Sequence, residues 1–164
     1  MEWSERVAGF DAGKIAFGAI FAVANRLQRV LDAVMPGLTA KQWWLLVVLS
    51  AFDQPPTLSE LADAADTSHQ NVRQILRKLE AGGFVTVTRD AHDGRTSRVN
   101  ATAKVGQWGA ATDIQARQFM EAMYADVSSH DVESLGRSLI RIHTALGRLT
   151  PMPVPINPST KGAL

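Results

Sequence analysis

The sequence predicts a mainly α-helical protein with one β-hairpin. Apolar residues recur at spacings of three and four in long stretches near both ends of the chain, which is typical of amphipathic helices. Between them, a short helix, a tight turn and a longer helix precede a stretch of alternating apolar and polar residues, which is typical of a strand. The expected divisions are an N-terminal helix over 1–37, a central lobe over 38–101, C-terminal helices over 102–149 and a Pro-rich flexible tail over 150–164.

Length and composition favour a small cytoplasmic protein. A chain of 164 residues fits one compact domain or two small intertwined ones. It has no cysteine, which excludes a disulfide framework, a thiolate zinc site and a thiol redox switch. Charged residues interrupt the apolar pattern of residues 1–34, so this stretch resembles neither a signal peptide nor a membrane span. We therefore expect a soluble protein in the cytoplasm with no membrane partner.

The first two helices carry clear start and stop signals. The first is expected from about Ala12 to Met35, where a Pro-Gly pair stops it. Thr39 and Gln42 then form a capping box that begins a second helix. That helix, "AKQWWLLVVLSAF", is apolar nearly all round, so we expect it at the centre of the core.

A helix-turn-helix outline follows. Thr57 and Glu60 form a second capping box that begins a short helix, and a tight turn is expected at Asp66. Thr67 or Ser68 begins the next helix, "SHQNVRQILRKLE". A short helix, a turn and a longer helix match a motif whose second helix enters the major groove of DNA. Because any two packed helices can show this outline, surface chemistry has to decide the function.

The polar face of this longer helix suits DNA. Its apolar stripe is Val72, Ile75, Leu76 and Leu79, and at about 100° per residue a polar stripe lies roughly 150° away. Arg pairs with guanine, Gln or Asn pairs with adenine, and a serine at a helix start can hold a phosphate. Lys78 lies off the polar stripe and is either a flanking phosphate contact or plain surface. The expected DNA-binding residues are Ser68, His69, Gln70, Asn71, Arg73, Gln74 and Arg77.

The positive charge of the chain is concentrated around this helix. The net charge of +1 divides into 0, −3, +4 and 0 over residues 1–38, 39–66, 67–104 and 105–164. A local basic surface on a balanced protein indicates an anionic partner such as double-stranded DNA. The alternative is a solvated helix face beside a hairpin.

Residues 84–101 are expected to form the β-hairpin. "FVTVTR" alternates as a strand, "DAHDG" is typical of a turn, and "TSRVNA" is a polar return strand. Three arginines, Arg89, Arg95 and Arg98, lie on the strands and their junctions. A projecting arginine suits the narrow minor groove, where the negative potential is concentrated. The alternative is a hairpin with incidental surface arginines.

Two long helices close the sequence. One begins near Thr102, an N-cap candidate, and is expected to reach about Val127. The other is expected from about Asp131 to Leu149 and carries a 3-4-3-4-3 apolar repeat, which is typical of a coiled-coil seam and requires a partner helix. The expected dimer seam is Val132, Leu135, Leu139, Ile142, Leu146 and Leu149.

Taken together, these motifs resemble the MarR family of winged helix-turn-helix repressors. The most specific pieces are "KLEAGGFV", which resembles the junction between helix and wing, and "RDAHDGR", which resembles the wing tip. The resemblance implies a winged helix-turn-helix lobe plus an α-helical dimerisation lobe built from the N- and C-terminal helices. It also implies that Arg95 reaches the minor groove and that Asp93 braces it by ion pairing.

The resemblance implies a sequence-specific regulator, a repressor, that binds a pseudo-palindromic operator as a homodimer. Its two recognition helices would then lie about one DNA turn, ~34 Å, apart. Family members often bind a small aromatic or phenolic ligand where two lobes meet, and this weakens their hold on DNA. The aromatic candidates for such a pocket, each of which can equally be a core residue, are Phe17, Phe21, Trp43, Trp44 and Trp108.

An enzyme is not expected, because the sequence has no Gly-rich phosphate loop, nucleophile motif or recognisable carboxylate pair. No cofactor is expected either. His130, Asp131 and His143 lack the tight spacing of metal ligands, so we expect no metal site. The remaining alternative is a winged-helix protein–protein interaction module that binds an acidic protein without specific DNA binding.

Overall fold

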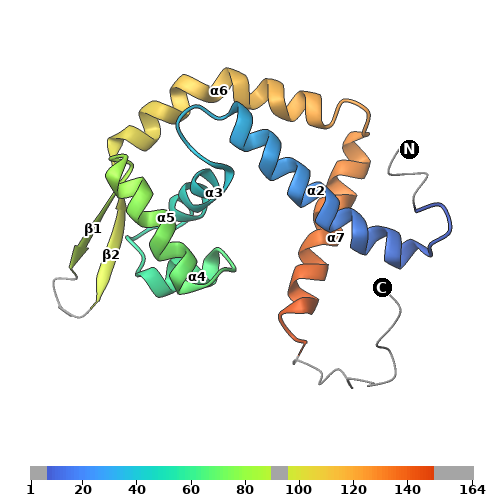
Figure 1. The fold of residues 1–164 in the computed structure, drawn as a ribbon, viewed down its shortest axis with the longest axis horizontal. Helices are drawn as coiled ribbons and strands as arrows, with labels where there is room; N and C mark the ends of the chain where they lie inside the picture. Colours follow the sequence, from blue (N-terminus) through green and yellow to red (C-terminus); the bar gives the residue numbers. More distant parts are fainter. Residues whose placement is uncertain (1–6, 90–95, 150–164) are drawn as a thin grey trace, which may run out of the picture. The chain divides into compact units, whose positions relative to one another are not determined.

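A computed structural model describes residues 7–89 and 96–149 of the chain. Within these residues, six helices and two strands follow one another in the order α2, α3, α4, α5, β1, β2, α6 and α7 (Figure 1). The mainly α-helical class with one hairpin is therefore confirmed. The expected hairpin tip, with Asp93 and Arg95, and the expected tail lie outside the described residues.

The chain divides into two compact units, Met1–Ala111 and Thr112–Leu164, with the boundary inside α6. The sequence-based division at residue 102, between a DNA-binding lobe and the C-terminal dimerisation helices, stays a prediction. The first unit contains α2 (Ala12–Val34), α3 (Ala40–Ser50), α4 (Leu58–Ala64), α5 (His69–Ala81), β1 (Val85–Arg89), β2 (Ser97–Ala101) and the start of α6 (Ala103–Met123). The second unit contains the rest of α6 and α7 (Ser129–Leu146).

The predicted capping boxes are both present. Thr39 Oγ1 accepts from Gln42 N at 3.3 Å, and Gln42 Oε1 accepts from Thr39 N at 2.8 Å. Thr57 Oγ1 likewise accepts from Glu60 N at 3.1 Å, and Glu60 Oε2 accepts from Thr57 N at 2.7 Å. These reciprocal bonds satisfy N–H groups that have no partner within the first helical turn, so they set the first residues of α3 and α4.

The turn between α4 and α5 occurs where the sequence predicts it. Asp66 has a φ of +48°, the left-handed conformation that Asp tolerates better than most residues. Ser68 is the N-cap of α5, because its Oγ accepts from Asn71 N at 3.2 Å. At the other end, Gly82 caps the helix and Gly83 has a φ of +74°, which a side chain would strain. The two glycines therefore turn the chain from α5 into β1.

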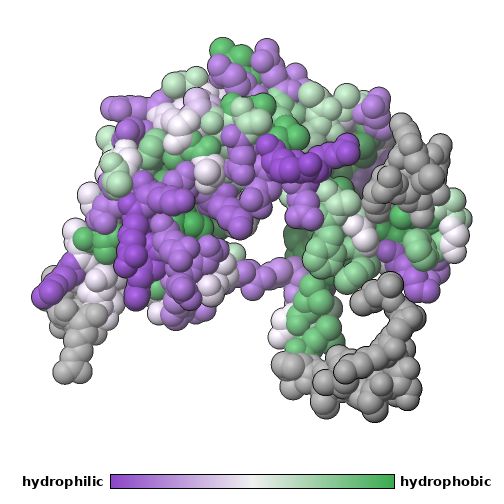
Figure 2. Space-filling model, viewed as in Figure 1, coloured by the Kyte–Doolittle hydropathy of each residue, from purple (hydrophilic) through white to green (hydrophobic). Residues whose placement is uncertain are grey.

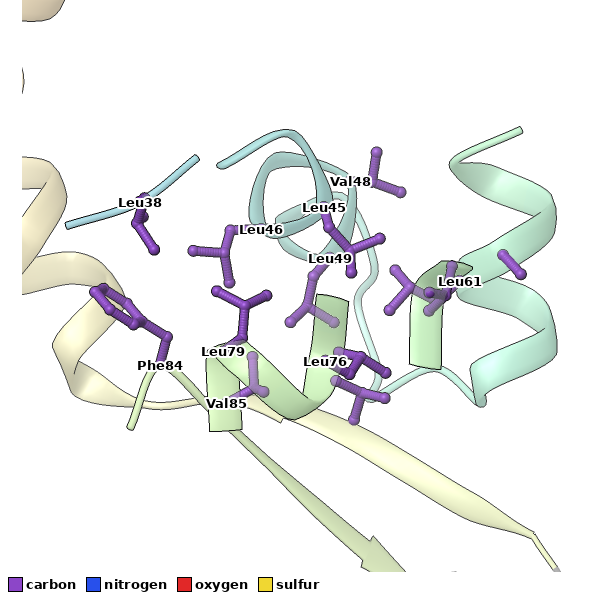
Figure 3. Close-up of a cluster of buried hydrophobic side chains, with 13 residues drawn as sticks. Leu38, Leu45, Leu46, Val48, Leu49, Leu61, Leu76, Leu79, Phe84 and Val85 are labelled. Carbon is purple, nitrogen blue, oxygen red and sulfur yellow. The ribbon is translucent and has the colours of Figure 1, made fainter. Parts of the chain in front are cut away.

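The core of the first unit lies between α3, α4, α5 and the hairpin (Figure 3). Leu45 of α3, Leu61 of α4 and Leu79 of α5 are almost completely buried, as are Val85 and Val99 of the two strands. Each such side chain contributes about 1.5–3 kcal/mol relative to an exposed one. α3 is central, as predicted, but it is not buried all round, since Trp44 is 51% exposed and Val47 is also exposed.

The hairpin is antiparallel, with Val85 paired to Ala101, Val87 to Val99 and Arg89 to Ser97. Val85 and Val99 face the core, and Thr86 and Thr88 are exposed. The period-2 alternation of the sequence is thus reproduced at the base of the hairpin.

The last two helices differ from the prediction at their ends. α6 ends at Met123 rather than near Val127, and α7 runs over Ser129–Leu146 rather than 131–149. Ser128 begins α7 early because its Oγ accepts from Asp131 N at 3.1 Å, and Gly147 is its C-cap. Thr102, the N-cap candidate of α6, uses its hydroxyl to donate to the carbonyl oxygen of Gly83 at 2.7 Å.

Candidate nucleic-acid interface

Helix α5 is held by one face and leaves the other exposed. Val72, Leu76 and Leu79 are buried in the core, and Ile75 packs partly buried against it. Because these four positions share one side of the helix, the polar residues turn outward. The hydrophilic surface over α4 and α5 is plain in Figure 2. The exposed residues among the predicted DNA contacts of α5 are Ser68, His69, Gln70, Arg73, Gln74 and Arg77.

Asn71, the seventh predicted contact on this helix, is engaged in the turn instead. It is half-buried, and its Nδ2 donates to Thr67 Oγ1 at 2.8 Å. Its backbone N–H donates to Ser68 Oγ. This pair of bonds keeps the turn closed at the start of α5, so part of the amide that we expected on a base edge stabilises the motif.

A groove of about 440 Å³ separates α5 from the hairpin. We call it the wing groove. The start of α4 supplies hydroxyl groups, α5 supplies cationic and imidazole groups, and the hairpin supplies further hydroxyl groups and an apolar floor. Its lining residues are Thr57, Leu58, Ser59, His69, Arg73, Leu76, Arg77, Glu80, Val87, Thr96, Ser97 and Val99.

Glu80 carries the acidic group of α5, and it is bound to the hairpin. Its Oε1 accepts a hydrogen bond from the backbone N–H of Val87 at 3.1 Å. The carboxylate of Glu80 therefore gives a hydrogen-bond partner to the N–H of Val87, which points away from β2. In the wing groove, the two guanidinium groups of Arg73 and Arg77 outnumber the one carboxylate of Glu80, so the formal charge is positive.

Arg98 contacts residues at the start of α4 and in the loop before it. Its Nη1 donates to the carbonyl oxygen of Pro55 at 2.9 Å and lies 3.9 Å from Glu60 Oε2. Val99 N also donates to Pro56 O at 2.9 Å, and Thr57 forms a β-bridge with Arg98. We expected Arg98 to contact DNA, but the structure directs its guanidinium to the loop before α4. Arg89 remains exposed at the end of β1.

These contacts lower the pKa of Glu60 below its ordinary value of 4.5. The largest causes are the hydrogen bonds from the backbone N–H and the side chain of Thr57, and the positive charge of Arg98 adds to them. The ionised form of Glu60 is therefore the one that suits the start of α4.

A second groove, of about 230 Å³, lies on the other flank of α5, between α5 and the helices α2 and α3. We call it the α3 groove. Sequence reasoning missed it, because its residues come from three segments with no common motif. Its lining residues are Gln28, Asp32, Thr39, Lys41, Gln42, Asn71, Gln74, Ile75 and Lys78.

The aromatic candidates for an effector pocket lie on three helices. Phe17 and Phe21 of α2 are 67% and 59% exposed and stack edge to face at 5.1 Å between ring centroids. Trp43 and Trp44 belong to α3, where Trp43 is half-buried. Trp108 of α6 packs against the core and donates from Nε1 to Pro36 O at 2.9 Å. Neither the wing groove nor the α3 groove is lined by any of the five.

The predicted dimer seam is exposed in the single chain. Within the second unit, Val132 is half-buried and the other five seam residues are exposed. Figure 2 shows apolar residues along α7. α2 is similar, since none of its residues is buried although it carries Phe17, Ile20 and Phe21. Exposed apolar stripes of this length are typical of helices that bury their faces against a partner.

Residues 7–89 and 96–149 have neither a metal-ligand cluster nor a membrane-spanning helix. No group of three or more His, Asp or Glu side chains in these ranges is placed to hold a metal ion. No helix in the same ranges has both the length and the apolar character that crossing a membrane requires.

Comparisons with known proteins agree with this geometry. Residues 37–96 match the model of the MarR family. Over 142 residues, the chain is 28% identical to the transcriptional activatory protein BadR of Rhodopseudomonas palustris, covering 81% of this chain and 79% of BadR. The match to the family model spans α3, α4, α5 and β1, which supply part of the lining of both grooves.

Solved structures share the fold. The MepR–DNA complex of S. aureus superposes with a TM-score of 0.69 at 21% identity, covering 79% of this chain and 97% of that chain. BpsR of Bordetella bronchiseptica, in a study of how 6-hydroxynicotinic acid regulates its DNA binding, superposes with a TM-score of 0.69 at 18% identity, covering 78% and 98%. Residues 37–96 thus resemble the MarR family model, and the chain shares the winged-helix fold of these solved regulators.

Proposed function

We propose that this protein is a homodimeric transcriptional regulator that binds a pseudo-palindromic double-stranded DNA operator. The observation that carries the proposal is the exposed face of α5. This face carries Arg73, Arg77, Gln70 and Gln74, and the apolar stripe of the same helix is buried in the core. Arginine and glutamine side chains read guanine and adenine edges in the major groove, and each good bidentate pair discriminates by about 1–3 kcal/mol. The match of MepR, solved as a DNA complex, supports this use of the fold.

The hairpin is the second DNA-binding element of the proposal. Arg89 is exposed at the end of β1, and Asp93 and Arg95 would follow it at the tip, outside the described residues. An arginine inserted in the minor groove responds to its width and potential rather than to a base edge. The wing would therefore add affinity and shape preference, while α5 supplies sequence preference.

Dimerisation through the C-terminal seam supports the pseudo-palindrome. Leu135, Leu139, Ile142 and Leu146 lie on one face of α7, and all are exposed in one chain. Burying a leucine or isoleucine against a second copy contributes about 1.5–3 kcal/mol per side chain. A two-fold dimer would present two α5 helices about one DNA turn, ~34 Å, apart, so the operator would repeat in inverted orientation.

A small aromatic or phenolic effector completes the proposal. BpsR, whose DNA binding 6-hydroxynicotinic acid regulates, supports an aromatic ligand class. Trp43, Trp44, Trp108 and the Phe17–Phe21 pair offer aromatic surface for it. Such a ligand releases DNA only if it binds more tightly to a dimer whose recognition helices are wrongly spaced.

Repression is the proposed mode when the operator overlaps a promoter, since a bound dimer would exclude the polymerase. BadR is, by its name, an activator. The position of the operator on the promoter, rather than the fold, would therefore decide between repression and activation. A reporter driven by the bound promoter checks this: loss of the regulator raises expression under repression and lowers it under activation.

A gel-shift and footprint series tests the function. DNA flanking the protein's own coding region is titrated at rising salt, with random DNA of equal length alongside. We expect protection of an inverted repeat with an affinity about 10³-fold or more above that for random DNA. Equal affinity for both DNAs at every salt concentration would instead favour a winged-helix module that binds an acidic protein.

A further inference from the structure

The polar surface of α5 has two flanks. Arg73 and Arg77 are four residues apart and line the wing groove. Gln74 and Lys78, one position further on, are rotated by about 100° and line the α3 groove. The helix thus carries one row of polar residues toward the hairpin and another toward α3.

The α3 groove contains two lysines from different helices. Lys41 belongs to the first turn of α3 and Lys78 to the last turn of α5, and both are exposed. Gln42 and Gln74 add amide groups to the lining. The lining thus combines ammonium groups from two helices with hydrogen-bonding side chains.

Asp32 is the acidic member of the groove, and it is bound to the protein. Its Oδ1 accepts from the backbone N–H of Ala40 at 2.6 Å, which ties the end of α2 to the start of α3. This bond holds the carboxylate at the junction of the two helices. With two lysines and one aspartate, the groove has a formal charge of +1.

The shape of DNA decides what meets this flank. A helix with its side chains is about 10–12 Å across, and the major groove is about 12 Å wide. A recognition helix in that groove therefore has a sugar–phosphate strand along each side. If the hairpin lies over one strand, the other strand passes the opposite flank of α5.

We propose that the α3 groove holds phosphates of the DNA strand on the side of α5 away from the hairpin, with Lys41 and Lys78 as the contacts. This inference rests on the proposed DNA-binding function and adds a second backbone contact to it. Lysine supplies a point charge to a phosphate and reads no base. Lys41 and Lys78 therefore position α5 in the major groove and do not select the sequence.

The salt dependence of DNA binding tests the inference. Each phosphate contact on duplex DNA contributes about 0.9 to the slope of log affinity against log salt concentration. We expect Lys41→Gln and Lys78→Gln each to make the slope shallower by about 0.9 per subunit, or about 1.8 per dimer. The change should be the same on the operator and on random DNA, because neither lysine reads a base.

Lys14→Gln is the matched control. Lys14 is exposed and pairs with Asp11 at 3.0 Å at the start of α2, about 27 Å along that helix from Asp32 at 1.5 Å per residue. We expect its slope to equal that of the wild type. Thermal unfolding of all three variants, followed by circular dichroism, checks that the fold is retained, as substitution of exposed lysines should allow.

Three results would overturn the inference while leaving the proposed function intact. They are a wild-type slope in both lysine variants, a change in only one of them, and an equal change in Lys14→Gln, which would reflect total charge instead of a groove. In each case the wild type still prefers the operator. If the wild type shows no such preference, the proposed function fails and the inference fails with it.

Discussion

Arg98 of β2 donates a hydrogen bond from Nη1 to the carbonyl oxygen of Pro55 at 2.9 Å, across 43 positions of the chain. Beside it, Val99 N donates to Pro56 O, and Glu60 of α4 lies 3.9 Å from the same guanidinium nitrogen. On the other strand, Val87 N donates to Glu80 of α5. Both strands of the hairpin are thus tied to the helix-turn-helix, which sets the direction in which the wing leaves the lobe.

Replacing Arg98 separates positioning from DNA contact. We expect Arg98→Met to lower the free energy of unfolding by about 1 kcal/mol, because a charge-assisted bond to a carbonyl is lost at a side chain that is 39% exposed. Operator affinity should fall while the salt slope stays at the wild-type value. Arg89→Gln is the comparison, since a lost phosphate contact makes the slope shallower by about 0.9 per subunit. If the salt slope of Arg98→Met is shallower than that of the wild type, Arg98 contacts a DNA phosphate.

Arg73 is expected to read a base. Arg73→Ala should weaken binding to the operator by about 1–3 kcal/mol and relax the choice of base at one position in each half-site. Competition binding against a set of single-base operator variants measures both effects. An equal loss on operator and random DNA would assign Arg73 to a phosphate instead.

The apolar seam of α7 is expected to hold the dimer. Leu139→Asp places a charge in the seam and should give a monomer by sedimentation at micromolar concentration, with loss of binding to the full operator. Ile140→Asp is the matched control, because Ile140 is also an exposed apolar residue of α7 but lies about 100° away from the seam. If Leu139→Asp remains a dimer, the seam lies elsewhere.

Glu60 makes stability depend on pH in the acid range. Its pKa in the folded protein is lowered below 4.5 by the hydrogen bonds from Thr57 and by Arg98. A group with a depressed folded pKa stabilises the protein above its unfolded pKa, and this contribution is lost as pH falls from about 4.5 through the folded value. Urea unfolding of wild type and Glu60→Gln at several pH values should show a smaller difference below that window than above it. A difference that stays constant across the window would contradict this role.

Local signals account for most of the fold. Thr39 with Gln42 and Thr57 with Glu60 begin α3 and α4 because a capping box involves four consecutive residues, which the sequence displays directly. Gly83 ends the turn into β1 because few other residues tolerate its positive φ. The start of α7 was harder to predict, because Ser128 and Asp131 are both residue types that begin helices. In the structure Ser128 is the N-cap, since its Oγ accepts a hydrogen bond from Asp131 N.

The orientation of α5 could also be predicted from the sequence, since an apolar stripe at helical spacing indicates which side of a helix is buried. Arg73 and Arg77 are exposed for that reason. The same reasoning cannot tell an exposed polar residue from one that is bonded to a neighbouring element. It therefore counted Asn71 among free contacts, although its amide donates to Thr67.

By itself, then, the sequence determined the order of the helices, the hairpin, the buried face of α5 and the positive charge of residues 67–104, because each depends on residues a few positions apart. Tertiary structure alone decided that Arg98 anchors the wing to Pro55, that Glu80 binds β1, and that Lys41 and Lys78 share a groove. Those relationships join residues of different elements of the fold. They arise only when packing of the core brings these elements together, and no local periodicity encodes such contacts.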